Sequence, residues 1–279
     1  MRTLGIVAAL GACAALSATA GAAPLGAQEP NPWSWRGTVA QGRTLEVRGV
    51  MGVIRAEAAS GREVEVTAHK TAEDDDPDDV RIEVVQEGGD VTICAVYPGR
   101  GNTCERGGGQ MRTRRSDVHV AFTVRVPAGV EFVGAMVSGD VYATGLSADV
   151  ELSSVSGDVT GTGLGGRAEL HSVSGDVELE TSSGEASGRS VSGSVRATVR
   201  GRGTTPLHFS SVSGDLTISL PRDIGAEMEM STVSGDLSSD FPVTLGGRFN
   251  RRRMNARIGD GGRRLELSTV SGSIRIRAL

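Results

Sequence analysis

Aromatic side chains are scarce in this sequence. Phe, Tyr and Trp together make up 3% of its 279 residues, which suits a narrow interior filled by aliphatic side chains and not a core built on large rings. Lys70 is the only lysine. The formal net charge is −5 at pH 7, and this mild acidity argues against general nucleic-acid binding, which favours a basic surface.

Helical periodicity and the common catalytic motifs are also missing. Gly, Ser, Thr and Val dominate, and no apolar pattern with a helical period occurs. The sequence contains no nucleophile elbow, phosphate-binding loop, zinc motif or dinucleotide fingerprint followed by a helix. Its histidines lack the spacing of metal ligands. We therefore predict no catalytic residues, no metal site and no cofactor.

One short motif, Val-Ser-Gly-Asp-Val, is present in abundance. It recurs with small variations, and its glycines are separated by 18, 18, 18, 21, 21 and 37 residues. A fixed period near 20 residues is typical of a solenoid in which each repeat forms one stacked coil. The sequence therefore predicts an all-β fold, a single-stranded β-helix or β-solenoid with about 18–21 residues per coil.

Each coil is expected to contain two strands that meet at a corner. Upstream of the motif, apolar and polar residues alternate, as around Val150 and Leu152, and a period of two indicates a half-buried strand. The valines that open the motif are expected to form an inward-facing column, and the serines that follow them an outward-facing one. These valines are Val137, Val155, Val173, Val191, Val212, Val233 and Val270.

The glycine of the motif is expected at the corner, because a tight bend often needs a positive φ, which glycine adopts without steric cost. The corner glycines are Gly139, Gly157, Gly175, Gly193, Gly214, Gly235 and Gly272. An aspartate follows in five coils and is expected to cap nearby backbone N–H groups; the alternative is that it binds a cation or a glycan at the surface. These corner aspartates are Asp140, Asp158, Asp176, Asp215 and Asp236.

Residues 1–27 are predicted to be a signal peptide. Arg2 gives a positive start, an apolar run follows it, and small residues up to Ala27 offer cleavage sites. Two alternatives stay open, namely an uncleaved membrane anchor and a lipoprotein signal at Cys13. The protein is thus expected to be exported to the periplasm, the outer cell surface or the medium.

Cys94 and Cys104 would remain after export, in a compartment where disulfides persist. They flank a short, turn-rich segment, and we predict that they are bonded to each other. Closing so short a loop would stabilise the fold by roughly 2–3 kcal/mol in the chain-entropy model. The alternative is a metal-binding or redox-active pair.

The chain before the regular repeats is expected to form a linker and a cap. Residues 28–43 would be a linker or entry segment whose tryptophans dock on the body. Residues 44–134 would hold a first coil, because Gly52 aligns with the corner glycines, and a β-rich cap or insertion. An acidic run at 73–79 predicts either a solvated loop, paired with nearby arginines such as Arg106, or a calcium site.

The regular repeats are expected over residues 135–279, with the last repeat as the terminal coil. The spacing lengthens at an Arg-rich loop, residues 246–264. This loop would either be solvated or bind anionic lipid headgroups or acidic glycans, which would bring the protein close to a membrane. Its most compact cluster is Arg251, Arg252 and Arg253.

The sequence resembles the bacterial putative-adhesin domain family of unknown function. The resemblance rests on the repeated motif, on the strand that ends in Val124-Arg125-Val126-Pro127, and on the closing segment from Ile258 to Ile274. It covers residues 45–279. It implies a single-chain β-solenoid at the cell envelope with no known catalytic activity, although a fold alone does not establish adhesion.

Three functions are compatible with these features. The first, our main hypothesis, is a non-enzymatic envelope protein that presents a repetitive polar face to a glycan, a surface or another protein. The second is a carbohydrate-active β-helix enzyme, which would need a non-periodic cluster of carboxylates or arginines in a groove. The third is a structural, assembly or envelope-stress signalling module, for which an uncovered end of the stack would be evidence.

Overall fold

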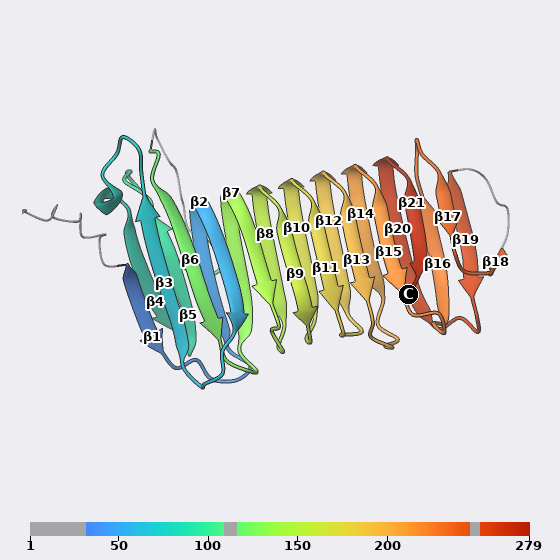
Figure 1. Ribbon diagram of the computed structural model, residues 1–279, viewed down its shortest axis with the longest axis horizontal. Helices are drawn as coiled ribbons and strands as arrows, with labels where there is room; N and C mark the ends of the chain where they lie inside the picture. Colours follow the sequence, from blue (N-terminus) through green and yellow to red (C-terminus); the bar gives the residue numbers. More distant parts are fainter. Residues whose placement is uncertain (1–31, 109–115, 246–251) are drawn as a thin grey trace, which may run out of the picture. The chain divides into compact units, whose positions relative to one another are not determined.

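The computed structural model describes residues 32–108, 116–245 and 252–279, and residues 32–279 form one compact unit (Figure 1). Within the described residues the regular structure is β-strand, apart from a 3-10 turn at Pro77–Asp79. No helix among them is long and apolar enough to cross a membrane. The all-β prediction is therefore confirmed.

The central coils each contribute one strand before the corner glycine and one after it. β7 (Glu131–Thr144) runs through its corner, and the pairs that follow are β8 (Val150–Ser156) and β9 (Val159–Leu164), β10 (Ala168–Ser174) and β11 (Val177–Thr181), β12 (Ala186–Ser192) and β13 (Val195–Val199), and β14 (Leu207–Ser213) and β15 (Leu216–Leu220). Each strand pairs in parallel with its equivalent in the next coil, as successive strands in Figure 1 show. This register is the one the repeat predicts.

The core lies between the two sets of parallel strands. Along a strand such as β10, buried and exposed side chains alternate until the corner, as expected for a strand with one face inward. The interior is one continuous cluster dominated by aliphatic side chains, with few rings among them, such as Phe132 and Phe209. The low aromatic content therefore reflects the narrow space inside a coil.

The N-terminal end is a β-rich cap, in which the first coil is β2 (Thr44–Ala58). One side of β2 pairs with β7, and Gly52 pairs with Gly139 as the alignment predicts. Its other side pairs with β5 (Asp90–Val96) and then with β6 (His119–Val126). Antiparallel strands continue both sheets outward, namely β4 (Arg81–Glu87) beside β5, β3 (Val64–Thr71) beside β6, and β1 (Trp33–Gly37) beside β3.

The segment expected to be a linker contains strand β1. Trp33 and Trp35 alternate with exposed residues in this strand and pack, partly buried, against the core. The docking of the tryptophans is confirmed, and it occurs through regular antiparallel pairing with β3.

The prediction that the last repeat is the terminal coil is wrong. Its strands β20 (Arg263–Ser271) and β21 (Ile274–Ala278) lie between the β14/β15 coil and the coil of β16 (Ala226–Ser231) and β17 (Leu237–Ser239). The outer side of β16 is covered by β19 (Arg253–Ile258) and then β18 (Val243–Leu245), both in antiparallel pairing. β19 returns the chain to the beginning of β16, and β20 then runs parallel to β16 on its inner side.

Candidate functional site

The valines that open each motif are exposed, so the prediction of an inward valine column is wrong. Their exposed fractions run from 37% at Val173 to 57% at Val233. Strand parity explains this. Leu152 faces inward, so the residue two positions later, Ser154, faces inward as well, and Val155 faces outward.

Each exposed valine is followed by an exposed serine, as predicted for the serines. We call these two rows together the corner ridge. It runs over seven adjacent coils and contains no charged residue. Its serines are Ser138, Ser156, Ser174, Ser192, Ser213, Ser234 and Ser271.

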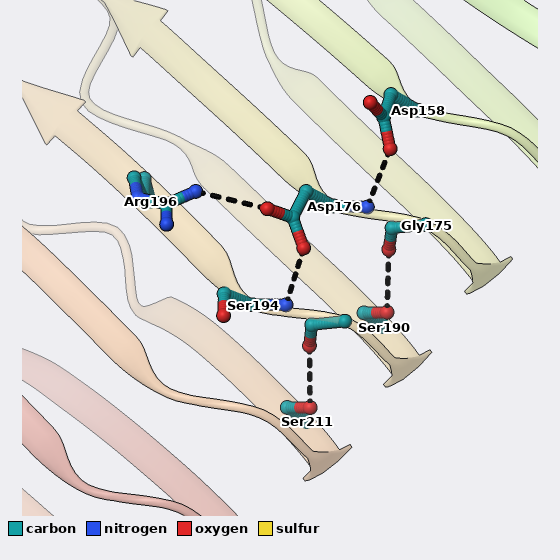
Figure 2. Close-up of polar contacts among 8 residues, drawn as sticks. Asp158, Gly175, Asp176, Ser190, Ser194, Arg196 and Ser211 are labelled. Carbon is teal, nitrogen blue, oxygen red and sulfur yellow. Dashed lines mark hydrogen bonds and ion pairs between the residues drawn. The ribbon is translucent and has the colours of Figure 1, made fainter.

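In six of the seven coils the inward position before the valine holds a hydroxyl side chain; in the β7 coil it holds Met136. Ser172 is 0% exposed, and its Oγ donates a hydrogen bond of 2.9 Å to the carbonyl oxygen of Gly157 in the preceding coil. Figure 2 shows the equivalent bonds from Ser190 to Gly175 and from Ser211 to Gly193. The remaining bonds of this series run from Ser154 to Gly139, Thr269 to Gly214 and Thr232 to Gly272. A buried hydroxyl thus ties each corner to its neighbour.

We expect Ser172→Ala to destabilise the fold by about 1–2 kcal/mol, because it leaves the Gly157 carbonyl without its donor. Ser172→Thr should have a much smaller effect, since Thr232 and Thr269 occupy this position in other coils. Chemical denaturation followed by circular dichroism measures both. Equal loss in the two variants would show that side-chain size, and not the hydroxyl, matters here.

The corner glycines are required because two backbones approach closely. A Cβ on Gly175 would lie 2.2 Å from the carbonyl oxygen of Gly157, and a Cβ on Gly193 would lie 2.1 Å from that of Gly175. The positive φ expected from the sequence occurs at Gly139 (144°), Gly157 (157°) and Gly235 (152°) but not at Gly175 or Gly193. In those central coils, the missing side chain and not the backbone angle makes glycine necessary.

Four of the five corner aspartates cap a backbone N–H group of the adjacent coil. Oδ1 of Asp158 accepts from the backbone N–H of Asp176 at 2.8 Å, and Oδ1 of Asp176 accepts from that of Ser194 at 2.8 Å (Figure 2). The other carboxylate oxygen of Asp176 bonds to Arg196 at 3.0 Å. Asp140 and Asp215 make the same capping bond, to Asp158 and Ser273, and Ser273 caps Asp236 through its hydroxyl. These carboxylates act in the stacking of the coils.

The predicted disulfide between Cys94 and Cys104 is confirmed, with a Cα–Cα distance of 5.7 Å. It joins β5 to the excursion that connects β5 with β6. In the same excursion the buried Tyr97 donates a hydrogen bond of 2.6 Å to the carbonyl of Val118, and burial raises the pKa of its phenol to about 12. The disulfide holds the excursion against β5, and the tyrosine bond holds the end of β5 against the start of β6.

The acidic run is folded around Asp117. This carboxylate accepts hydrogen bonds from the backbone N–H groups of Glu73, Asp74 and Asp75, and these donors hold the pKa of Asp117 below its usual value. Asp78 pairs with Lys70 at 2.8 Å. Within the described residues, no group of three or more His, Cys, Asp or Glu side chains is arranged to hold a metal ion.

Arginines near the acidic run do not pair with it as expected, where they are described. Arg106 forms its ion pair with Asp90, at 2.7 Å. Asp90 lies at the start of β5 and is nearly buried, so Arg106 compensates a charge of the cap. The arginines that follow in the sequence, Arg112, Arg114 and Arg115, lie outside the described residues.

Among its described residues, the Arg-rich segment contains paired surface arginines and a buried one, Arg263. Arg253 pairs with Glu229, and Arg257 with Glu227. Arg263 is only 2% exposed, so the interpretation of the whole segment as a solvated loop or an anion-binding surface is wrong at this residue. Arg252 lies in the described part of the chain, whereas Arg251 lies outside it.

Arg263 fills a space between the loops of two coils. Its guanidinium donates to the carbonyl oxygens of Gly184 and Gly201, while its Nε has no hydrogen-bond partner. A Cβ on Gly203 would come within 2.8 Å of the guanidinium. Burial lowers the pKa of Arg263 from its ordinary value. Strand parity distinguishes Arg263 from the exposed Arg264, because Arg263 lies two positions before the inward-facing Leu265.

A pocket of about 670 Å³ lies on the outer face of β16, β19 and β20. Glu227 and Glu229 line it, and these are the non-periodic carboxylates that the enzyme hypothesis requires. Glu227 pairs with Arg257, and Glu229 pairs with Arg253 and lies 3.8 Å from Arg264. Both carboxylates are therefore engaged by arginines that belong to neighbouring strands.

The geometry defines a parallel β-solenoid whose corners are joined by glycine, hydroxyl and aspartate contacts. The chain belongs to the family described as Toastrack DUF4097, whose model matches residues 41–277. The family resemblance found in the sequence is thereby confirmed. No similar protein was found among proteins with curated functions.

Solved structures with detectable similarity share little sequence with this chain. A putative cell adhesion protein from Clostridium sporogenes is 12% identical, with a TM-score of 0.36, over 89% of this chain and 100% of that one. A putative adhesin from Bacteroides fragilis is 15% identical, with a TM-score of 0.42, over 88% and 97%. A putative lipid binding protein from Parabacteroides distasonis is 13% identical, with a TM-score of 0.25, over 88% and 96%.

Proposed function

We propose that the protein is an exported, non-enzymatic component of the bacterial cell envelope that binds its partner through the corner ridge. The observation that carries this proposal is the exposure of an apolar row on seven consecutive coils. Contiguous exposed apolar surface is uncommon on soluble proteins and marks sites of interaction. The serines that follow these valines present hydroxyl groups with the same spacing along the ridge.

Export is supported by the leader predicted at residues 1–27 and by the disulfide, because disulfides persist mainly outside the cytosol.

The non-enzymatic part of the proposal is supported by the contacts of the carboxylates. Four of the five corner aspartates cap backbone N–H groups of the adjacent coil, which gives them a structural role, whereas acid–base catalysis needs two carboxylates in environments that separate their pKa values. Glu227 and Glu229, in the pocket, are ion-paired.

The test is attachment of the purified full-length protein, carrying a fluorescent label, to cells of the source bacterium. We expect the wild-type protein to bind and the double variant Val173→Asp/Val191→Asp to lose most of this binding, because charges on the ridge would have to be desolvated. The matched control is Thr198→Asp/Thr217→Asp, which places the same charges on the outer face of β13 and β15. Equal binding by both double variants would refute the proposed role of the ridge.

A further inference from the structure

The corner ridge has a defined beginning within the molecule. The residue equivalent to the ridge valines in the first coil is Val50, since Gly49 and Met51 pair with Met136 and Ser138. Val50 is only 3% exposed and belongs to the same buried cluster as Tyr97 and Val118. The hydroxyl of Tyr97 also lies 3.4 Å from the carbonyl oxygen of Met51. The cap therefore covers this row at the first coil and leaves it exposed from Val137 onward.

The exposed part of the ridge repeats at the spacing between hydrogen-bonded strands, about 4.8 Å. Parallel pairing keeps the valines in line, because Ser154 and Ser156 pair with Ser172 and Ser174 on either side of Val155 and Val173. A partner that contacts every valine must carry complementary groups at the same repeat. A second copy of this chain meets that requirement over its whole length.

We propose, building on the binding role of the ridge, that its partner is the corner ridge of a second copy of this chain. The same surface would then be used by both copies, as in most two-fold symmetric assemblies. The ridge itself carries no charge, and four of the corner aspartates beside it are hydrogen-bonded to backbone N–H groups of the adjacent coil. Side chains of one valine row fit between those of the other, as in tightly packed ladders of identical strands.

The size of the ridge sets the strength of this association. Six steps of about 4.8 Å make the ridge about 29 Å long, and it is two residues wide. Such a strip falls below the roughly 800 Å² per partner that stable complexes bury. The pair is therefore weak in dilute solution and forms when many copies are held together on a surface, where the effective concentration is high.

Analytical ultracentrifugation of the full-length protein over about 1 μM to 1 mM, the range of weak complexes, tests this proposal. We expect a concentration-dependent dimer for the wild-type protein and for Thr198→Asp/Thr217→Asp. For Val173→Asp/Val191→Asp we expect association weakened by about tenfold or more. Circular dichroism should show the same fold for all three proteins. In addition, Val191→Cys should be joined to its partner copy by a short bis-maleimide, whereas Thr198→Cys should not.

Two results would overturn the inference. One is a wild-type protein that stays monomeric over the whole concentration range, and the other is equal association of the two double variants. Attachment to cells from which the gene has been deleted separates this inference from the proposed function. Binding to such cells through the ridge would refute the second copy as partner and leave the proposed function standing, whereas binding lost on deletion supports self-association.

Discussion

Replacing Gly175 by valine is expected to abolish cooperative folding of the solenoid. The Cβ would lie 2.2 Å from the carbonyl oxygen of Gly157. The backbones of both residues are held in place by the parallel strands on either side. The clash can be relieved only by separating two coils, which would also break the buried hydrogen bond from Ser172 to Gly157. We expect a loss of about 4 kcal/mol or more, at the upper end for single substitutions.

Thermal unfolding followed by circular dichroism measures this loss. The matched control is Gly61→Ala, because a Cβ on Gly61 meets nothing within 4 Å, and we expect stability close to that of the wild-type protein. Gly175→Ala should fall between the two, nearer to Gly175→Val, since the first added carbon already makes the contact. A Gly175→Val protein with wild-type stability would contradict the close stacking of the corners.

Replacing Arg263 by alanine is expected to cost about 3 kcal/mol or more. The change removes the donor to the carbonyls of Gly184 and Gly201 and leaves a cavity between two loops. An unsatisfied buried carbonyl costs about 1–3 kcal/mol, and the cavity adds to this loss. Arg263→Lys should recover only part of it, because an ammonium group lacks the planar fork that reaches both carbonyls.

The neighbouring Arg264 provides the control for Arg263. Its side chain is 62% exposed and pairs with glutamates at the surface, and exposed ion pairs contribute about 0–1 kcal/mol. Arg264→Ala should therefore change the denaturation midpoint little. Similar losses for the two alanine variants would mean that Arg263 is not the buried contact between the loops.

The sequence predicts most of the strands and the alignment of the corner glycines in one column, because both follow from the period of the repeat. It also contains the information that places the motif valines outward. Val150 and Leu152 face inward, and a strict alternation puts Ser154 inward and Val155 outward. Hydrophobicity alone predicts the opposite direction for these valines. Parity prevails because the backbone fixes the direction of each side chain, and the buried hydroxyl finds an acceptor in the adjacent glycine carbonyl.

Two other features depend on contacts distant in the sequence. Parity with Leu265 turns Arg263 inward, but no local pattern encodes the loops at Gly184 and Gly201 whose carbonyls accept its hydrogen bonds. The position of the last repeat depends on the antiparallel return of β19, which lies in the segment where the period fails. The period fixes the coils themselves but not their order once it is interrupted.

The insertion of β20 and β21 between earlier coils has a consequence for how the stack can grow. A chain that folds as it emerges can add coils one after another through β15, since each new strand pairs with one already present. β16 can pair with β19 on its outer side, but it has no partner within the stack until residues 263–278 have arrived, because its inner partner is β20. The last two coils must therefore assemble together. This end of the solenoid is completed by β20, which is synthesised after β16, the strand that it connects to the stack.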